Sequence, residues 1–564
     1  MKAGPAPRST PILAASAALL ALALAFGIGR YGDPRELLIH GFYFYLWAVV
    51  AYLAWALRDD LRESRRGPAD APRRLALPAA IAISLTAATF ICVQPAFRIL
   101  SDDTDMADTA WSLYRDRAFL TPAAAIPRFG VLHVLTSGLP VRPGLFPFLV
   151  SLLHTVLGYD AGHCFLLNFL VSILILVAVV EWGRAVRGTA FGVIAAVLLA
   201  SFPLYSLCVA AAGFDALNCL FLLLVARQIH RFLAKPSPFR LEVLMLLCVL
   251  GSQCRYETVL VVIPAALAAC LRARELAGRE FPKRFWSLPF LFLPAIWQRW
   301  AQGTAGLPLP GERRALFGAG YILPNMKGTL AFFLDPGRHH YPNSPLFFAA
   351  AVAGAAMAIL RRGEGSRPRR EAAVLIALML ALAAATQLAF IYGDPTFNLS
   401  THYCLIYLGF AALCAAYPVY LLFRTRPGRI LVPALLLADL AFHLRVAAAN
   451  EFGRTYQPLI AYAKNISALK PFDPKETLLV ADIPQEFLAY RYGAVDFDYA
   501  NSRRAALMEG LARRQYANIL VLRRVSTDGA IHGGSLAADF KQETIDEYPV
   551  GSKQFIFRLS RVLP

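Results

Sequence analysis

Charged residues are scarce in this 564-residue chain, where they make up 16% of the sequence against 57% hydrophobic residues. A soluble chain of this length would carry charge on about a quarter of its residues, so the composition speaks against a soluble enzyme. Apolar runs of about twenty residues recur along the chain, and a helix needs that length to cross a bilayer. The sequence therefore predicts a polytopic α-helical membrane protein.

Paired cysteines are also lacking. The nine cysteines lie in or beside apolar segments, none forms a Cys-x-x-Cys pair, and the polar region 450–564 contains none. This pattern speaks against a disulfide framework and against a cysteine metal site. We interpret the cysteines as small apolar residues that fill space between helices.

The chain has no arginine-rich arm, no stretch that mixes aromatic and basic residues, no internal repeat and no low-complexity tract. The net charge of +19 therefore does not indicate a nucleic-acid partner. The basic residues instead fall in short loops between apolar runs, as the positive-inside rule predicts. The absence of a repeat also removes the usual signature of an inverted-repeat transporter.

Thirteen stretches are candidate membrane spans, the weakest being the short, nearly continuous pair within 240–272. They are 11–28, 39–57, 76–98, 162–182, 189–208, 213–232, 240–255, 257–272, 285–301, 344–360, 371–391, 402–422 and 430–447. We interpret the first as a retained span and not a signal peptide, because it is long and another follows at once. With the N-terminus inside, every strongly basic short loop is cytoplasmic. The odd number of spans then places the C-terminal region outside.

The predicted outer segments carry most of the remaining information. The first, from 101 to 162, contains a helix-like stretch 104–118 and an apolar stretch 143–158 that fits a helix lying on the membrane surface. The other two are 302–343 and 392–401. After Ala447 the chain turns polar, with strand-like 478–482, 519–525 and 554–560 and a helix-like 503–517. This alternation predicts a small α/β domain outside the membrane.

The sharpest polar motif is Ser101-Asp102-Asp103-Thr104-Asp105, directly after the third span. Helix capping explains one or two of these carboxylates, because acidic side chains favour a helix N-terminus. It does not explain why adjacent acids lie so close to a membrane boundary, so capping and function both stay open. A divalent cation is possible at Asp102, Asp103 and Asp105, since carboxylate oxygens suit hard cations, but the cluster has no distinctive ligand spacing.

The stretch 101–120 resembles the first outer loop of the GT-C superfamily of integral membrane glycosyltransferases, which includes the protein O-mannosyltransferases and the lipid A aminoarabinose transferases. That loop begins with an acidic pair, matched by Asp102-Asp103, and continues through small and apolar residues, matched by Ala110, Leu113 and Phe119. In the family, a Pro-led surface helix and then a basic turn with glycine follow this loop, and they are matched here by 142–158 and 182–188. Two later stretches, 333–336 and 398–403, are also similar to family elements. The resemblance covers about residues 80–425.

The resemblance implies that a sugar on a polyprenyl phosphate is transferred to a hydroxyl of a glycan, lipid or protein acceptor. Asp102 matches the family's general base and Asp103 its acidic neighbour, and a single displacement would invert the anomeric centre. In the family the acidic loop follows the first span, whereas here it follows the third. We therefore expect a two-span extension over 1–75, a GT-C-like catalytic domain over 76–447 and an extracytoplasmic domain over 448–564.

A cation must stabilise the departing lipid phosphate, and three places offer one. Arg255 and Glu257 lie between two predicted spans on the outer side, where Arg255 either pairs locally with Glu257 or Asp215 or binds the phosphate. A basic set on the second outer loop either meets the phosphate or meets anionic headgroups; it comprises Lys327, Arg338, His339 and His340. His402-Tyr403 stands where the family has Arg-Tyr, and His402 either packs at the span end or contacts phosphate or sugar.

Two other functions stay open from the sequence alone: a transporter or flippase of a lipid-linked glycan, and a non-catalytic assembly scaffold. A transporter would be expected to carry ionisable residues in mid-span, whereas here most lie at span ends and in loops. The abundance of alanine, arginine and leucine suggests a GC-rich bacterial genome. We therefore expect a bacterial inner membrane protein with a cytoplasmic N-terminus and a periplasmic C-terminal domain, surrounded by membrane lipids.

Overall fold

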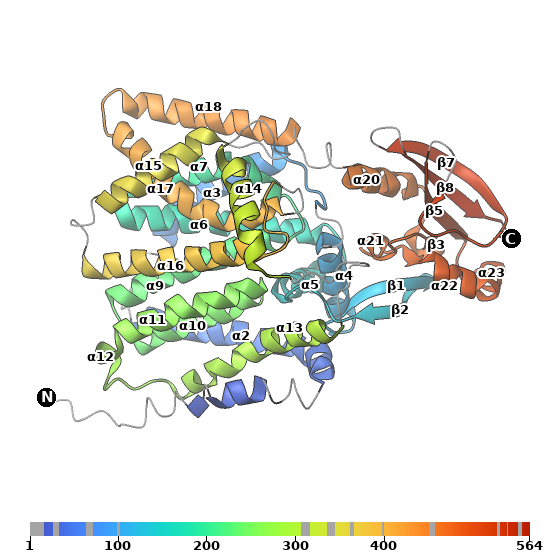
Figure 1. Cartoon of the computed structure of the whole chain (residues 1–564), viewed down its shortest axis with the longest axis horizontal. Coiled ribbons are helices and arrows are strands. Elements are labelled where there is room, and N and C mark those ends of the chain that lie inside the picture. The colour runs from blue at the N-terminus through green and yellow to red at the C-terminus, as the bar shows by residue number, and fades with distance from the viewer. Residues whose placement is uncertain are drawn as a thin grey trace.

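The computed structural model has a helical body with a sheet domain at one end (Figure 1). It describes residues 16–17, 19–25, 27, 33–63, 71–98, 102–305, 316–334, 344–360, 366–396, 400–449, 457–526, 531–538, 540–550 and 555–563. Within these residues, seven helices are long and apolar enough to cross a membrane. They are α2 (Arg35–Glu63), α3 (Ala71–Cys92), α6 (His163–Arg187), α9 (Asp215–Ala234), α16 (Arg367–Ala389), α17 (Leu405–Phe423) and α18 (Gly428–Ala449). The chain is an integral membrane protein.

The remaining predicted spans are shorter or broken helices. The stretch 189–208 forms α7 (Thr189–Ser201) and α8 (Pro203–Val209), which are bent by 76° and make an eighth span if counted as one. The other predicted spans form α10 (Pro238–Ser252), η2 (Tyr256–Val261) with α11 (Val262–Leu271), η3 (Lys283–Phe292) with α13 (Leu293–Ala305), and α15 (Pro345–Leu360). The short helix α12 (Ala273–Leu276) lies in the loop between two of them. Helices therefore stand where twelve of the spans were predicted. Of the stretch 11–28, the structure describes residues 16–17, 19–25 and 27, which are helical. The number thirteen stays a prediction.

A network of buried ion pairs holds one end of the helical body together. At one end, Asp60 of α2 is 1% exposed and binds Arg231 at 2.8 Å and Arg240 at 3.1 Å. Beside it, Arg284 binds Asp59 at 2.7 Å and Glu242 at 2.9 Å. These ion pairs thus join the predicted cytoplasmic loops to the helix ends beside them. Because buried charges need partners, this network fastens α2 to the rest of the body.

Helix α2 is part of the main core. Its side chains Leu38, Phe42, Leu46 and Val49 are buried in the same hydrophobic cluster as α6, α9 and α10. Phe42 stacks on Phe119 with ring centroids 3.9 Å apart, and the Phe119 N–H donates to the Ile39 carbonyl. The extension predicted over 1–75 therefore supports the first outer segment through α2, and its status as a separate unit stays a prediction.

The first outer segment holds more structure than the sequence indicated. It contains α4 (Asp102–Arg115), the strands β1 (Thr121–Arg128) and β2 (Val131–Gly138), and α5 (Leu145–Leu157). The helices confirm the expected stretches 104–118 and 143–158 to within a few residues. The antiparallel hairpin β1–β2 was not foreseen, because prolines and alanines in 121–128 hide its strand pattern. The second outer segment likewise contains η4 (Ala319–Tyr321) and α14 (Ile322–Leu334), and the third ends at η6 (Thr401–Cys404).

The sheet joins distant parts of the chain, with strand order β2-β1-β4-β3-β5-β8-β7 and β6 paired with β5. Its other strands are β3 (Thr477–Val480), β4 (Gly493–Val495), β5 (Asn518–Ser526), β6 (Ile531–His532), β7 (Gln542–Val550) and β8 (Phe555–Val562). Strands β3, β4 and β5 are parallel, and β1 adds antiparallel to β4 through Ala125 and Ala494. The helices are α20 (Gln457–Leu469), η7 (Pro474–Glu476), α21 (Gln485–Leu488), α22 (Phe497–Ser502) and α23 (Arg504–Ala512). The α/β class of this domain is confirmed, with a hairpin from the first outer segment added to it.

The hairpin connects the C-terminal domain to the segment that carries Asp102. Helix α4 leads into β1, and Arg142 follows β2 by four residues. Helix α21 packs against both α4 and β1, and the Tyr159 hydroxyl donates to the Ala489 carbonyl at 2.6 Å. Figure 1 shows α4, α5 and the hairpin between the helical body and the sheet. The geometry around Asp102 therefore depends on how the C-terminal domain docks.

Replacing Gly493 by Val is expected to disrupt this docking. A Cβ at Gly493 would lie 2.2 Å from Pro127 Cδ and 2.8 Å from Pro127 N, so the strands β1 and β4 would have to separate. Overpacking of this kind costs about 1–3 kcal/mol or more, and limited proteolysis should then cut the hairpin 121–138. Gly138→Ala is the matched control, because a Cβ there meets nothing within 4 Å. Equal protection of the hairpin in both variants would contradict the coupling.

Candidate functional site

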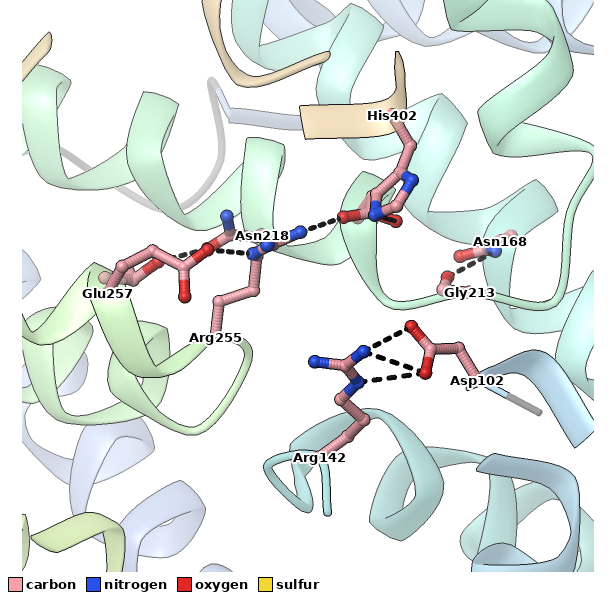
Figure 2. Close-up of polar contacts among 10 residues, drawn as sticks. Asp102, Arg142, Asn168, Gly213, Asn218, Arg255, Glu257 and His402 are labelled. Atoms are coloured by element: carbon pink, nitrogen blue, oxygen red, sulfur yellow. Dashed lines mark hydrogen bonds and ion pairs between the residues drawn. The ribbon is translucent and has the colours of Figure 1, made fainter. Parts of the chain in front are cut away.

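The site begins at the N-terminus of α4, where Asp102 forms a bidentate ion pair with Arg142 (Figure 2). Arg142 Nη2 lies 2.9 Å from Asp102 Oδ1 and 2.7 Å from Oδ2, and Nε lies 3.0 Å from Oδ1. The two side chains are 32% and 19% exposed. This fork geometry is the strong form of an arginine–carboxylate contact, and both groups keep access to solvent.

The backbone that carries Arg142 is tightly held. The Gln298 side-chain amide of α13 donates to the carbonyls of Pro140 and Arg142 at 3.0 and 2.9 Å. Next to it, Gly144 packs on α2, since a Cβ there would lie 2.2 Å from the Phe42 ring. Only glycine permits this approach. The position of Arg142 is thus set by α2 and α13 as well as by the hairpin.

Asp103 faces inward. It is 1% exposed, and its Oδ2 accepts the Arg98 backbone N–H at 2.8 Å. Gly213 lies against it, with the position of an added Cβ 3.0 Å from Asp103 Oδ1, and Asn168 holds the carbonyls of Ala211 and Gly213 at 2.7 and 2.8 Å. Through the bond to the Arg98 N–H, Asp103 anchors the start of α4.

A second charged group stands beside the first (Figure 2). Arg255 binds Asp215 of α9 at 2.6 Å and Glu257 at 2.5 Å, and its guanidinium lies 4.5 Å from the ring centroid of Tyr403. His402 Nε2 lies 3.9 Å from the other oxygen of Asp215. The structure therefore contains the local pairs that sequence reasoning set against phosphate binding. Two carboxylates offset the desolvation of one buried arginine.

The two arginines border one cavity of about 440 Å³. Its polar lining includes Arg142, Arg255, Glu257 and Arg299. The apolar lining comes from several helices and includes Leu260, Leu316, Phe317, Ala383, Phe390 and Ile406. A cavity lined by both arginines and apolar side chains is suited to a ligand that has an anionic head and a hydrocarbon tail.

The structure brings together some of the predicted residues and not others. Arg255, Glu257 and Tyr403 line the cavity, and His402 is buried behind them. Lys327 lies exposed on α14 and is not among the residues that line this cavity. The predicted residues Arg338, His339 and His340 lie outside the described residues. Sequence reasoning assigned no role to Arg142 or Arg299, although Arg142 was noted as the start of a family motif.

The acidic cluster is not gathered around one point. Asp102 pairs with Arg142, and Asp103 caps the Arg98 N–H. Within the described residues, no group of three or more His, Cys, Asp or Glu side chains is placed to hold a metal ion. The divalent cation considered from the sequence has no ligand set in this part of the chain.

Asp105 has an unusual protonation equilibrium. Burial, and then the charge of Asp102, raises its pKa to about 7. Between the unfolded value of about 4 and 7, the folded chain binds one more proton than the unfolded chain at this group. Stability therefore falls as the pH rises through this window. Around neutral pH the folded protein carries a mixture of charged and neutral Asp105 beside the site.

Asp105→Asn is expected to flatten the pH dependence of stability. The thermal midpoint of the wild-type protein should fall more steeply than that of the variant between pH 5 and pH 8, because only the wild type must bury a carboxylate. Thermal unfolding in detergent at several pH values measures this. Asp116→Asn, at the exposed end of the same segment, is the matched control. Parallel curves for wild type and Asp105→Asn would contradict the raised pKa.

A comparison with known families finds a match for one segment of the chain. Residues 141–297 match the model of the dolichyl-phosphate-mannose-protein mannosyltransferase family. The matched segment starts beside Arg142 and includes Asp215, Arg255 and Glu257. The match covers about a quarter of the chain, which over this segment is similar to that family of glycosyltransferases. The resemblance drawn from the acidic loop is thereby confirmed, and so is the prediction of a glycosyltransferase.

Several solved structures resemble this chain at low identity. The oligosaccharyltransferase of Archaeoglobus fulgidus in complex with Zn and sulfate is 11% identical, with a TM-score of 0.44 over 81% of this chain and 74% of that one. ArnT from Cupriavidus metallidurans bound to undecaprenyl phosphate is 12% identical, with a TM-score of 0.41 over 87% and 98%. A search of the curated proteins finds no match. The prediction of a glycosyltransferase is therefore supported by the family match over residues 141–297.

Proposed function

We propose that this chain transfers a sugar from a polyprenyl-phosphate donor to a hydroxyl acceptor on the outer face of its membrane, with Asp102 as general base. The observation that carries the proposal is the ion pair between Asp102 and Arg142, since Arg142 also lines the cavity beside Arg255. A lipid-linked sugar phosphate has the anionic head and apolar tail that this lining suits. ArnT from Cupriavidus metallidurans was solved with such a lipid, undecaprenyl phosphate.

The reaction needs one proton transfer and one displacement. The acceptor O–H gives its proton to a carboxylate oxygen of Asp102 while the acceptor oxygen bonds to the anomeric carbon of the sugar. The bond between that carbon and the phosphate oxygen breaks, and the polyprenyl phosphate leaves with the electron pair. Arg142 and Arg255 stabilise the charge on the leaving phosphate. One displacement inverts the anomeric centre.

The ion pair suggests an order of events. Arg142 donates to both oxygens of Asp102, so it competes with an acceptor hydroxyl for this carboxylate. A donor phosphate would compete for the same guanidinium, because arginine binds phosphate and carboxylate in the same forked geometry. We infer that donor binding draws Arg142 toward the cavity and frees Asp102 for the acceptor.

Purified protein incubated with a polyprenyl-phosphate sugar and a membrane extract that supplies acceptors tests the function. The proposal expects free polyprenyl phosphate and a glycosylated acceptor to form in equal amounts. In sealed vesicles, movement of the labelled lipid sugar across the bilayer without its cleavage would favour a flippase instead. For a location, we propose the bacterial inner membrane, with the basic loops cytoplasmic and the sheet domain periplasmic.

A further inference from the structure

A second cavity lies where the membrane body meets the C-terminal domain. It has a volume of about 270 Å³ and is lined by the hairpin together with Tyr159, Lys475 and Arg491. Tyr159 comes from the turn after α5, whereas Lys475 and Arg491 come from the C-terminal domain. The cavity is therefore formed only when the two parts of the chain are docked.

Arg491 is the unusual residue in this cavity. Its guanidinium lies 4.8 Å from the ring centroid of Trp111 and 5.0 Å from that of Tyr159. Its Nε is buried and has no hydrogen-bond partner, and among the described residues it forms no ion pair. Arg115 contacts the same Trp111 ring at 4.3 Å but also binds Asp116. Of the two arginines on this ring, Arg491 is the one without a carboxylate.

The backbone also holds Arg491 in place. Its φ is 69°, in the left-handed region that residues with a side chain seldom adopt. Its N–H donates to the Leu488 carbonyl at 2.8 Å, and the neighbouring Ala489 carbonyl accepts the Tyr159 hydroxyl. Such conformations persist where the surroundings over-determine them, and they gather at functional sites.

The buried acid Asp108, whose charge would act on Arg491, does not serve as the missing partner. Asp108 is fully buried on α4, and neither of its carboxyl oxygens has a hydrogen-bond partner. Burial, and then the charge of Asp105, raises the pKa of Asp108 well above its usual range, which favours the neutral form of this carboxyl. Burial also lowers the pKa of the Arg491 guanidinium. A group so placed gains most from an anion supplied by a ligand.

We propose that this cavity binds an anionic oxygen group, a phosphate or a carboxylate, carried by the acceptor. The aromatic faces hold the guanidinium plane and leave its N–H groups for a forked contact with the anion, while Lys475 adds positive charge at the rim. Trp111 and Asp102 lie nine residues apart on α4, or about 14 Å along the helix. An acceptor held here would span that distance to the base. The assignment of the anion to the acceptor rests on the proposed function, whereas the binding of the anion does not.

Labelling with phenylglyoxal, which modifies arginine side chains, tests the site residue by residue in the full-length protein. Peptide mass spectrometry measures the modification of Arg491 at constant ionic strength, in chloride, in inorganic phosphate and in glucuronate. We expect phosphate or glucuronate to slow the labelling of Arg491 at least fivefold, and the stronger of the two identifies the group. Arg523 is the matched control, because it too is partly buried on the C-terminal domain with an unpartnered Nε, and its labelling should not change.

Two results would overturn the proposal: labelling of Arg491 that neither anion slows, or equal slowing at Arg523. Asp102→Asn protein should show the same protection as wild type, so failure of the transferase function would leave this result intact. Arg491→Gln should raise the KM for the acceptor at least tenfold with little change in kcat, whereas Arg523→Gln should leave both near wild type. A fall in kcat alone would contradict a role in acceptor binding.

Discussion

Asp102→Asn is expected to lower the transfer rate by about 10²–10⁴-fold, the range that a positioned general base contributes. The amide is nearly isosteric with the carboxylate but cannot accept the acceptor proton. Its partner Arg142 is 32% exposed, so losing the pair should change stability little. Release of polyprenyl phosphate by the purified variant, together with its thermal midpoint, measures both effects.

The control for this variant is Asp116→Asn. Asp116 also pairs with an arginine, Arg115, at 2.5 Å, and both of those side chains are well exposed. Removing it breaks another arginine–carboxylate pair of the same outer segment without touching the cavity, so transfer should stay near the wild-type rate. An Asp102→Asn protein that transfers sugar within about threefold of wild type would remove Asp102 from the mechanism.

Arg255→Gln is expected to lose both stability and transfer. Asp215 is 8% exposed and would keep a buried charge without its partner, and breaking a buried pair in this way costs about 3–5 kcal/mol. The cavity would also lose one of the cations proposed to meet the leaving phosphate. The thermal midpoint and the transfer rate should therefore both fall sharply.

The double variant Arg255→Gln/Asp215→Asn separates the two effects. Asp215 is the more buried of the two carboxylates that lose Arg255. Replacing it by a neutral amide should therefore recover much of the lost stability. Transfer should stay low, since the phosphate still lacks the guanidinium. If the double variant recovers transfer together with stability, Arg255 is a structural residue and the pairing with Asp215 and Glu257 is its whole role.

Local patterns predicted the parts of this protein that depend on neighbouring residues. The apolar runs marked the helices, and the acidic motif with its following helix located the start of α4. Arg255 and Glu257 were found because charges between two apolar stretches are rare and need an explanation. Each of these features can be recognised within a window of about twenty residues.

The features that were missed depend on contacts between distant residues. Arg142 lies 40 positions after Asp102, and the intervening hairpin that sets their approach has no clear alternation of apolar and polar residues. Its partner strand β4 follows about 370 residues later and is three residues long. Helix α14 was not predicted, because the segment that contains it is rich in glycine and proline. Pairing over such separations is a property of the folded chain.

The number of membrane crossings illustrates a different limit. Stretches such as 240–255 and 257–272 are apolar and helical, but α10 and α11 are too short to pass as spans by length and composition. The apolar content of such a helix shows that it avoids water. It does not show whether lipid or protein surrounds the helix. Helix α10 is almost wholly buried in protein, which explains why its hydrophobicity alone suggested a span.

The most direct test of the account is a structure of the full-length protein in a lipid nanodisc with undecaprenyl phosphate. We expect the phosphate within hydrogen-bond distance of Arg142 and Arg255, the tail along the apolar wall near Phe390, and the Arg142–Asp102 contact loosened. A phosphate bound at the opposite end, beside Asp60 and Arg231, or at the correct end but away from both arginines, would contradict the proposed site.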